Sequence, residues 1–229
     1  MIEPIRDHEP EPGFLEQIRE ITSEIGAILI MDEITSGFRL NTGGTHLIFG
    51  ITPDIAVFAK AMSNGYPMAA VIGKAEVMQA AQLSFISSTY WTERIGPAAA
   101  LATIRKHKQE DVSKHLIRMG ELVQSGWNLA AEQTGLNVKI GGIPPLSHFI
   151  IKDENTQSAH TLFTQLMLER GFLACRSFYA TYAHREEHIK AYTRNVTETF
   201  FIIGDAIKRG KLMHMLKGPV AHTGFRRLT

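Results

Sequence analysis

Residues 27–33, AILIMDE, and residues 54–60, DIAVFAK, are two short apolar runs that each end in charged side chains. Continuous apolar runs of this length are typical of strands that are buried on both faces of a sheet. The segment SNGYP (63–67) has turn chemistry, and AAVIG (69–73) is a third run of the same kind. Apolar spacing also predicts a helix over residues 14–25. This alternation predicts an α/β fold with a mostly parallel sheet.

The second half of the chain has a different pattern. Four helices are predicted from apolar residues at helical spacing, over residues 96–107, 113–133, 159–170 and 186–209. The strand candidates are VKIGG (138–142), SHFIIK (147–152) and GFLACR (171–176). We therefore expect three parts, which are a large α/β domain over residues 1–115, a small α+β domain over residues 116–209 and a mobile tail over residues 210–229.

The composition excludes several classes of protein. Among 229 residues, 24 Lys and Arg oppose 23 Asp and Glu, for a formal net charge of +1, which argues against nucleic acid or an anionic membrane as a partner. The single cysteine cannot form an internal disulfide, which fits a reducing compartment. Apolar runs are too short to span a bilayer, and the first residues lack the apolar core of a signal peptide. We expect a soluble cytoplasmic protein.

Asp32 and Lys60 form the most informative pair of side chains, because each lies at the carboxyl end of one of the two apolar runs. In a parallel sheet those ends meet at the edge where ligands bind. A carboxylate and an amine at that edge suit pyridoxal 5′-phosphate: the amine forms a Schiff base with the aldehyde, and the carboxylate keeps the pyridine nitrogen protonated. From the residues alone, a plain salt bridge remains the alternative.

The segments around this pair resemble one enzyme family. MDEITSGFR (31–39), PDIAVFAKAMSNGYP (53–67) and SSTYWTERIGPAAALAT (87–103) are together similar to class III aminotransferases, the fold-type I group that includes glutamate-1-semialdehyde aminomutase. The resemblance runs from the first residues to about residue 205. It implies part of a fold-type I large domain, followed by the α+β small domain, and an amino-group transfer through a Schiff base on Lys60.

The resemblance also implies a role for each matching residue. Asp32 matches the partner of the pyridine nitrogen, and Lys60 matches the Schiff-base lysine that moves a proton between substrate Cα and cofactor C4′. Ile34 matches an apolar residue that packs against the ring, although an ordinary core isoleucine is the alternative. Thr89, with Ser88 as a weaker candidate, matches the threonine that reaches the cofactor phosphate of the neighbouring subunit. The implied protein is a homodimer that takes a small-molecule amino donor and acceptor.

The sequence also departs from the family. Family chains are longer, whereas this chain begins within the strand that carries Glu3 and Pro4. A phosphate site requires a Gly-rich loop that opens a helix directly after a strand, and the sequence has no such loop. We therefore expect the C-terminal portion of an aminotransferase or aminomutase, without its N-terminal half. The segment SNGYPMAAVIG is close to the aminomutase-like subgroup. The alternative is a non-catalytic remnant or interaction fragment.

A third hypothesis comes from HREEH (184–188), which fits the inverted zinc-protease pattern H-x-x-E-H. On a helix, His184 and His188 would share a face and bind zinc, with Glu187 as the base. Carboxylates at this point are better explained by a helix N-terminus, where the helix dipole stabilises negative charge. We prefer the helix N-terminus, expect no metal site, and keep a zinc hydrolase as a remote alternative.

Overall fold

The computed structural model describes residues 1–224 except Arg6, Ser88 and Trp91. The chain divides into two compact units, Met1–Ile117 and Arg118–Thr229. The long helix α4 (Val112–Thr134) begins in the first unit and continues in the second. Each unit has its own three-stranded sheet. Among the described residues, no helix is both long and apolar enough to cross a membrane.

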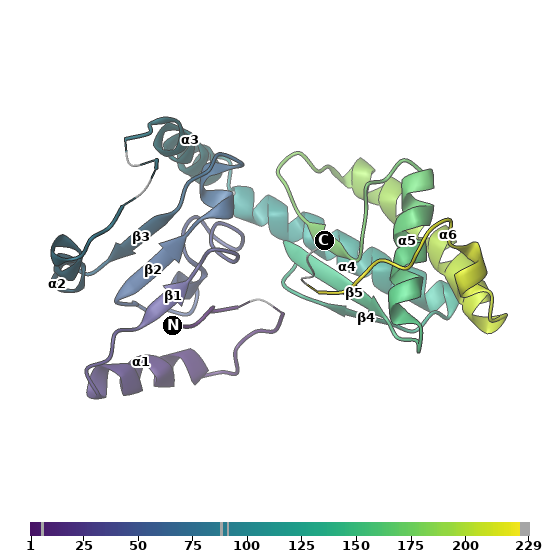
Figure 1. Ribbon diagram of the computed structural model, residues 1–229, viewed down its shortest axis with the longest axis horizontal. Coiled ribbons are helices and arrows are strands. Elements are labelled where there is room, and N and C mark those ends of the chain that lie inside the picture. Colours follow the sequence, from purple (N-terminus) through teal and green to yellow (C-terminus); the bar gives the residue numbers. More distant parts are fainter. Residues whose placement is uncertain (6, 88, 91, 225–229) are drawn as a thin grey trace. The chain divides into compact units, whose positions relative to one another are not determined.

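The first unit is built on a sheet with the order β1-β2-β3 (Figure 1). β1 (Ile30–Asp32) and β2 (Ile55–Phe58) are parallel, as the sequence predicts. Ile2 adds a further parallel bridge to Met31 of β1. The other elements of this unit are α1 (Phe14–Glu24), η1 (Thr45–Leu47), η2 (Lys60–Ser63), β3 (Ala70–Gly73), α2 (Ala75–Met78), η3 (Gln79–Leu83) and α3 (Ile95–Gln109).

The third strand differs from the parallel pairing that the sequence suggests. β3 runs antiparallel to β2, with Phe58 opposite Ala70. A parallel return would need a crossover of a dozen or more residues, usually a helix. Here the connection is η2 and a turn in which Asn64 and Gly65 both have positive φ, 51° and 97°. Two successive left-handed residues reverse the chain, so β3 comes back beside β2 in the opposite direction.

Two buried clusters hold the helices of this unit against the sheet. In one, Leu15 of α1 packs with Leu29, Met31 and Ile51. In the other, the buried residues are Phe38, Ala56, Phe58, Met62 and Ala100. Full burial of each large apolar side chain stabilises the fold by about 1.5–3 kcal/mol. The second cluster joins β2, η2 and α3, so it fixes the segment that begins at Lys60.

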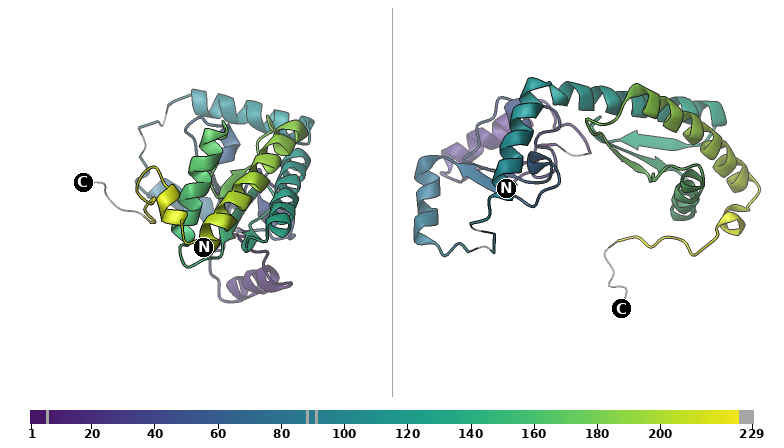
Figure 2. Two further views of the ribbon diagram at one scale, coloured as in Figure 1. Left: turned by 90° about the vertical axis from the view of Figure 1, so that its right-hand side faces the viewer. Right: turned by 90° about the horizontal axis from the view of Figure 1, so that it is seen from above.

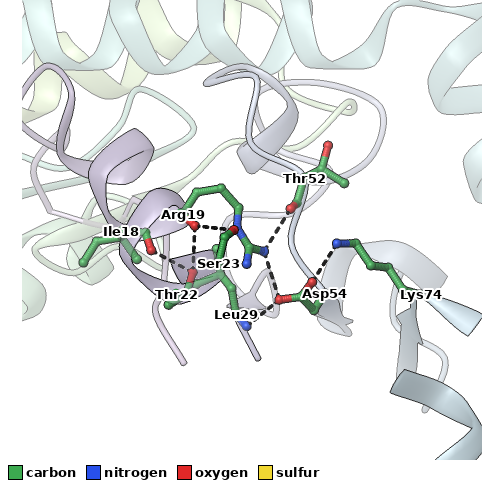
Figure 3. Close-up of polar contacts among 8 residues, drawn as sticks. All are labelled: Ile18, Arg19, Thr22, Ser23, Leu29, Thr52, Asp54 and Lys74. Atoms are coloured by element: carbon green, nitrogen blue, oxygen red, sulfur yellow. Dashed lines mark hydrogen bonds and ion pairs between the residues drawn. The ribbon is translucent and has the colours of Figure 1, made fainter. Parts of the chain in front are cut away.

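Asp54 ties several elements together just before β2 (Figure 3). Its Oδ2 accepts hydrogen bonds from the Leu29 backbone N–H at 2.8 Å and from Arg19 of α1 at 2.9 Å, and its Oδ1 pairs with Lys74 Nζ at 2.8 Å. Burial raises the pKa of this carboxyl, but the bonds from Lys74, Leu29 and Arg19 outweigh it and hold the pKa well below its usual range. Asp54, Arg19, Leu29 and Lys74 are called the Asp54 network below. They link α1, β1, β2 and β3 at the edge of the sheet that is opposite the carboxyl ends of β1 and β2.

The second unit has an antiparallel sheet with the order β4-β5-β6. Its elements after α4 are β4 (Val138–Gly141), β5 (Leu146–Ile151), α5 (Thr156–Glu169), β6 (Ser177–Tyr179), α6 (Glu186–Lys208) and η4 (Leu212–Met215). The prediction of a strand over residues 171–176 is wrong, because the strand β6 begins only at Ser177, after this segment has ended. Gly171 ends α5 with φ 82°, the Ala174 N–H bonds to the Phe172 carbonyl, and Leu173 is 95% exposed. The apolar residues of this segment therefore belong to a turn and not to a strand.

Phe149 of β5 is the centre of the core of the second unit. Its ring lies 5.0 Å from Trp127 of α4, 4.9 Å from Phe163 of α5 and 5.4 Å from Phe200 of α6, all in edge-to-face contact. Trp127 Nε1 donates a hydrogen bond to the Tyr192 hydroxyl at 3.0 Å, which joins α4 to α6. These two helices lie side by side along the sheet (Figure 2). One strand residue thus holds three helices, and such aromatic pairs stabilise beyond their buried area.

Candidate active site

The carboxyl ends of β1 and β2 bring Asp32 and Lys60 to one edge of the sheet. Asp32 is the last residue of β1 and lies opposite Val57 in the parallel register. Lys60 is the first residue of η2 and follows the end of β2 at Phe58. Because the two strands are parallel, the carboxylate and the amine leave the sheet at the same edge. This is the edge at which α/β sheets bind their ligands.

Asp32 is held at this edge by its own turn. Its Oδ1 accepts the backbone N–H of Ile34 at 3.0 Å, which makes an Asx turn at the end of β1. Both residues are half-buried. The turn therefore fixes the carboxylate relative to the sheet and places the Ile34 side chain on the same short segment.

Lys60 has a strained backbone. Its φ of 47° lies in the left-handed region, which residues other than glycine rarely adopt. The side chain is exposed, and Nζ donates a hydrogen bond to Thr35 Oγ1 at 2.8 Å. Strain of this kind costs about 1–3 kcal/mol and clusters at functional sites. Sequence reasoning missed Thr35, whose signal is its place in DEITSG, directly after the residues that end β1.

Glu33 organises the loop that presents Thr35. It is fully buried, and its Oε1 accepts hydrogen bonds from the backbone N–H and the Nδ1–H of His46, at 2.8 and 2.7 Å. Its Oε2 accepts the Thr45 N–H and the Ser36 hydroxyl, both at 2.9 Å. Burial raises the pKa of Glu33, but the bonds from His46, Thr45 and Ser36 outweigh burial and lower the pKa. The Glu33 carboxylate therefore binds both Ser36, near the start of the loop, and Thr45 and His46, at its end.

One of the two phosphate candidates, Thr89, lies on the loop between η3 and α3. Thr89 is in a turn of this loop, and its side chain is exposed. Ser88 lies outside the described residues. Among the hydrogen bonds of the described residues, none joins Thr89 to Asp32 or Lys60, so the role of Thr89 stays a prediction. Its exposure is compatible with contact to a second molecule.

The structure does not place the two histidines of the zinc hypothesis on one helical face. α6 begins at Glu186, so His184 precedes the helix and shares no helical face with His188. Nδ1 of His184 accepts the Thr181 backbone N–H at 3.0 Å, and Nδ1 of His188 accepts the Arg185 N–H at 3.2 Å. Within the described residues, no three His, Cys, Asp or Glu side chains are grouped to hold a metal.

A carboxylate and a lysine at the carboxyl edge of parallel strands are the residue types with which pyridoxal-phosphate enzymes hold the pyridine nitrogen and the aldehyde of their cofactor. A family model described as aminotransferase class-III matches residues 1–195. The chain belongs to the class III aminotransferase family.

Known relatives agree with this assignment. The 3-aminobutyryl-CoA aminotransferase of Cloacimonas acidaminovorans (strain Evry) is 35% identical over 190 residues, which cover 80% of this chain and 46% of the relative. Sphingopyxis sp. MTA144 FumI, solved as its PLP internal aldimine form, has a TM-score of 0.85 at 21% identity, over 90% of this chain and 52% of that one. An omega-transaminase from Sphaerobacter thermophilus has a TM-score of 0.75 at 21% identity, over 86% and 49%. The two solved structures show a shared fold-type I architecture. The chain spans about half the length of these relatives.

Proposed function

We propose that this chain is the lysine-bearing portion of a pyridoxal-phosphate-dependent class III aminotransferase, and that the whole protein transfers an amino group between two small molecules. The observation that carries the proposal is that Asp32 and Lys60 follow two parallel strands to the same edge of the sheet, within the residues that match the family. The left-handed backbone of Lys60 and its exposed side chain support the proposal, because backbone strain of this kind clusters at functional sites.

The residues at this edge fit pyridoxal phosphate. The Lys60 amine would hold the aldehyde carbon covalently, the Asp32 carboxylate would hold the pyridine nitrogen in its protonated form, and Ile34 would pack against the ring. Bound there, the cofactor supplies an electron sink for charge that develops at the substrate Cα. Thr89, with Ser88, would bind the cofactor phosphate of a partner subunit in a homodimer.

The chain's own groups have separate tasks in this reaction. Lys60 Nζ would take the proton from the substrate Cα and give it up again, as a general base and then as a general acid. Thr35 Oγ1, 2.8 Å from that nitrogen, orients it. Asp32 stays fixed by the Ile34 N–H throughout.

The relatives also bear on the kind of reaction. The curated relative is named as an aminotransferase, which favours transfer between two molecules over an internal shift of the amino group. An aminomutase would instead return one isomerised product from a single substrate, so product analysis separates the two. We further propose that residues 1–115 serve as part of the cofactor-binding domain and residues 116–209 as the small domain. The unpaired Cys175 is consistent with work in the cytoplasm.

Reductive labelling tests the proposal. The chain is mixed with pyridoxal phosphate, reduced with borohydride and digested for peptide mapping. We expect the label on Lys60, and loss of the label in Lys60→Ala, because Lys60 and Asp32 lie at the same edge of the sheet, where α/β folds bind their ligands. Lys74→Ala is the matched control, since Lys74 is paired with Asp54 at the opposite edge. A label on Lys74, or spread evenly over exposed lysines, would contradict the assignment and support a non-catalytic fragment.

A further inference from the structure

The loop between β1 and η1, residues 33–44, carries Thr35 next to the Lys60 amine and is called the site loop below. The Glu33 carboxylate binds groups near the start of the site loop and just past its end. The tip of the site loop has a second anchor, which comes from α3. His107, near the end of this helix, is 5% exposed and contacts the tip with both ring nitrogens.

The two ring nitrogens of His107 bind different groups. Nε2 lies 3.1 Å from the Phe38 carbonyl oxygen, and Nδ1 lies 2.7 Å from the Thr42 hydroxyl oxygen. A carbonyl oxygen only accepts, so Nε2 carries the ring proton and Nδ1 accepts the Thr42 O–H. Burial lowers the pKa of His107 more than the Phe38 carbonyl and Asp111 raise it, so the ring is neutral at pH 7. One tautomer of the neutral ring therefore satisfies both bonds.

The backbone of Phe38 is strained, which makes its bond to His107 important. Its φ of 60° lies in the left-handed region, which residues with a Cβ rarely adopt. Its N–H donates to the Gly43 carbonyl at 2.8 Å, and its own carbonyl accepts from His107. The first bond comes from within the site loop and the second from α3. The strained conformation persists because its surroundings hold it on both sides.

The Phe38 ring connects the loop tip to the segment that carries Lys60. This ring lies 5.7 Å from the Phe58 ring in edge-to-face contact, and both rings belong to the buried cluster that includes Met62. Phe58 ends β2 and Met62 lies in η2, so these two residues flank Lys60 along the chain. The His107 ring lies edge-on to Phe38 at 5.9 Å. Because close-packed interiors transmit strain, a shift of the loop tip would move the backbone on either side of Lys60.

Thr35 gives the site loop a second connection to Lys60. It precedes Phe38 by three residues, and its Oγ1 accepts a hydrogen bond from Lys60 Nζ at 2.8 Å. Lys60 is therefore restrained near its backbone by the Phe38 ring and at its nitrogen by the Thr35 hydroxyl. Both restraints belong to the loop that His107 anchors.

We propose that His107 is a positioning residue for the Lys60 amine. Its imidazole fixes the tip of the site loop through the Phe38 carbonyl and the Thr42 hydroxyl, and the fixed loop holds Lys60 in place for the cofactor aldehyde. None of the hydrogen bonds among the described residues joins His107 to Asp32 or Lys60, so it acts through the loop. The inference rests on the proposed function, because it assigns His107 a part in the bond between Lys60 and the cofactor.

The test compares two lysines of the same chain. The 229-residue chain is mixed with pyridoxal phosphate, whose aldehyde condenses with an amine with loss of water, and borohydride reduces the product to a stable secondary amine. The label on Lys60 is divided by the label on Lys74 from the same digest, so the ratio does not depend on the amounts of cofactor and reductant. Hydrogen exchange at the Phe38 amide reports the loop tip separately.

Three variants separate positioning from space filling. In His107→Leu the side chain fills the buried volume and makes neither bond, whereas in His107→Gln the side-chain amide can still donate to the Phe38 carbonyl. If His107 only filled space, the apolar leucine would serve at least as well as glutamine. Thr42→Val removes one bond from a half-buried loop position, so it tests the role even if His107→Leu does not fold.

We expect His107→Leu to speed Phe38 exchange and to lower the labelling ratio about fivefold, since the net contribution of one hydrogen bond corresponds to roughly that factor. Thr42→Val should change both measurements in the same direction, with a fall in the ratio of about twofold, at the low end for one hydrogen bond. His107→Gln should retain most of the ratio of the unsubstituted chain.

The outcomes that contradict the inference differ from those that contradict the proposed function. An unchanged ratio in His107→Leu and Thr42→Val would overturn the positioning role and leave the proposed function standing. A ratio as low in His107→Gln as in His107→Leu would assign His107 to space filling and would also overturn the role. If the unsubstituted chain shows no preference for Lys60 over Lys74, the proposed function fails and the positioning role fails with it.

Discussion

Two adjacent carboxylates at the end of β1, those of Asp32 and Glu33, lie in different environments. Side chains alternate along a strand, so Asp32 and Glu33 point to different sides of the chain. Glu33 is buried and accepts four hydrogen bonds, all from its own loop. Asp32 accepts one backbone N–H among the described residues, and it is half-buried at the ligand edge. The Asp32 carboxylate is therefore suited to a bound group, and the Glu33 carboxylate holds the loop that presents Thr35.

Asp54 offers the sharpest test at the scale of one residue. Asp54→Ala should lower the free energy of unfolding by about 2–3 kcal/mol, because the buried Leu29 N–H loses its acceptor and Arg19 loses its partner. Lys74→Met should cost no more than about 1 kcal/mol, because the Lys74 side chain is 42% exposed. Urea unfolding at neutral pH measures both.

The same variant also carries a pH signature. The folded-state pKa of Asp54 lies below its ordinary value of 3.8, so the carboxylate stabilises the fold above that value and loses this contribution as the pH falls below it. The difference between the unsubstituted chain and Asp54→Ala should therefore shrink in acid. A constant difference from pH 7 down to pH 3 would contradict an ionised role.

At the scale of elements, the local signals in the sequence are reliable and the long-range ones are not. Apolar spacing places α1, α3, α4 and α6 close to their observed bounds, because that spacing records which face is buried. It cannot give the direction of β3, which is decided by the left-handed residues Asn64 and Gly65. The hydrogen bond between His46 and Glu33 likewise cannot be predicted from the sequence, because it depends on how a loop folds back.

Replacing a helical glycine by alanine should change the stability in opposite directions at two positions of this chain. Alanine inside a helix is normally better than glycine by about 0.5–1 kcal/mol. A Cβ at Gly204 of α6 would meet its nearest neighbour, Leu136, at an ordinary 3.9 Å, so Gly204→Ala should stabilise by that amount. A Cβ at Gly120 of α4 would lie 1.8 Å from the Pro144 carbonyl oxygen, so Gly120→Ala should destabilise by about 1–3 kcal/mol.

Thermal unfolding of the two alanine variants distinguishes packing from propensity. A rise in the midpoint for both variants would mean that α4 does not approach the backbone at Pro144. A fall for both would mean that α6 is packed more tightly than the structure shows at Gly204.

At the scale of the whole molecule, the first unit exposes many apolar side chains. Leu83 and Phe85 are 93% and 96% exposed, and Val71 and Ile72 of the edge strand β3 are 54% and 56% exposed. Monomeric soluble proteins rarely leave large apolar patches uncovered, and an apolar edge strand is a site of association. The relatives are about twice as long as this chain, so we propose that further protein covers these residues in the intact enzyme.

Light scattering checks this reading of the surface. The purified chain should self-associate in a concentration-dependent way, and Leu83→Ser with Phe85→Ser should reduce the association. Leu173→Ser is the control, because Leu173 is equally exposed, at 95%, but belongs to the second unit. A monodisperse monomer at all concentrations would show that the exposed side chains are not an association surface.

The Asp54 network also has a consequence for synthesis on the ribosome, where a chain emerges from its amino end and folds as it appears. Arg19 and Leu29 have already left the ribosome when Asp54 emerges, so two of the three partners of Asp54 are available to it at once. Lys74 comes later, directly behind β3. Until then the second oxygen of Asp54 lacks its cation, and β2 has only its parallel neighbour. We therefore expect β3 and the Lys74 contact to be the last parts of this sheet to become available during translation.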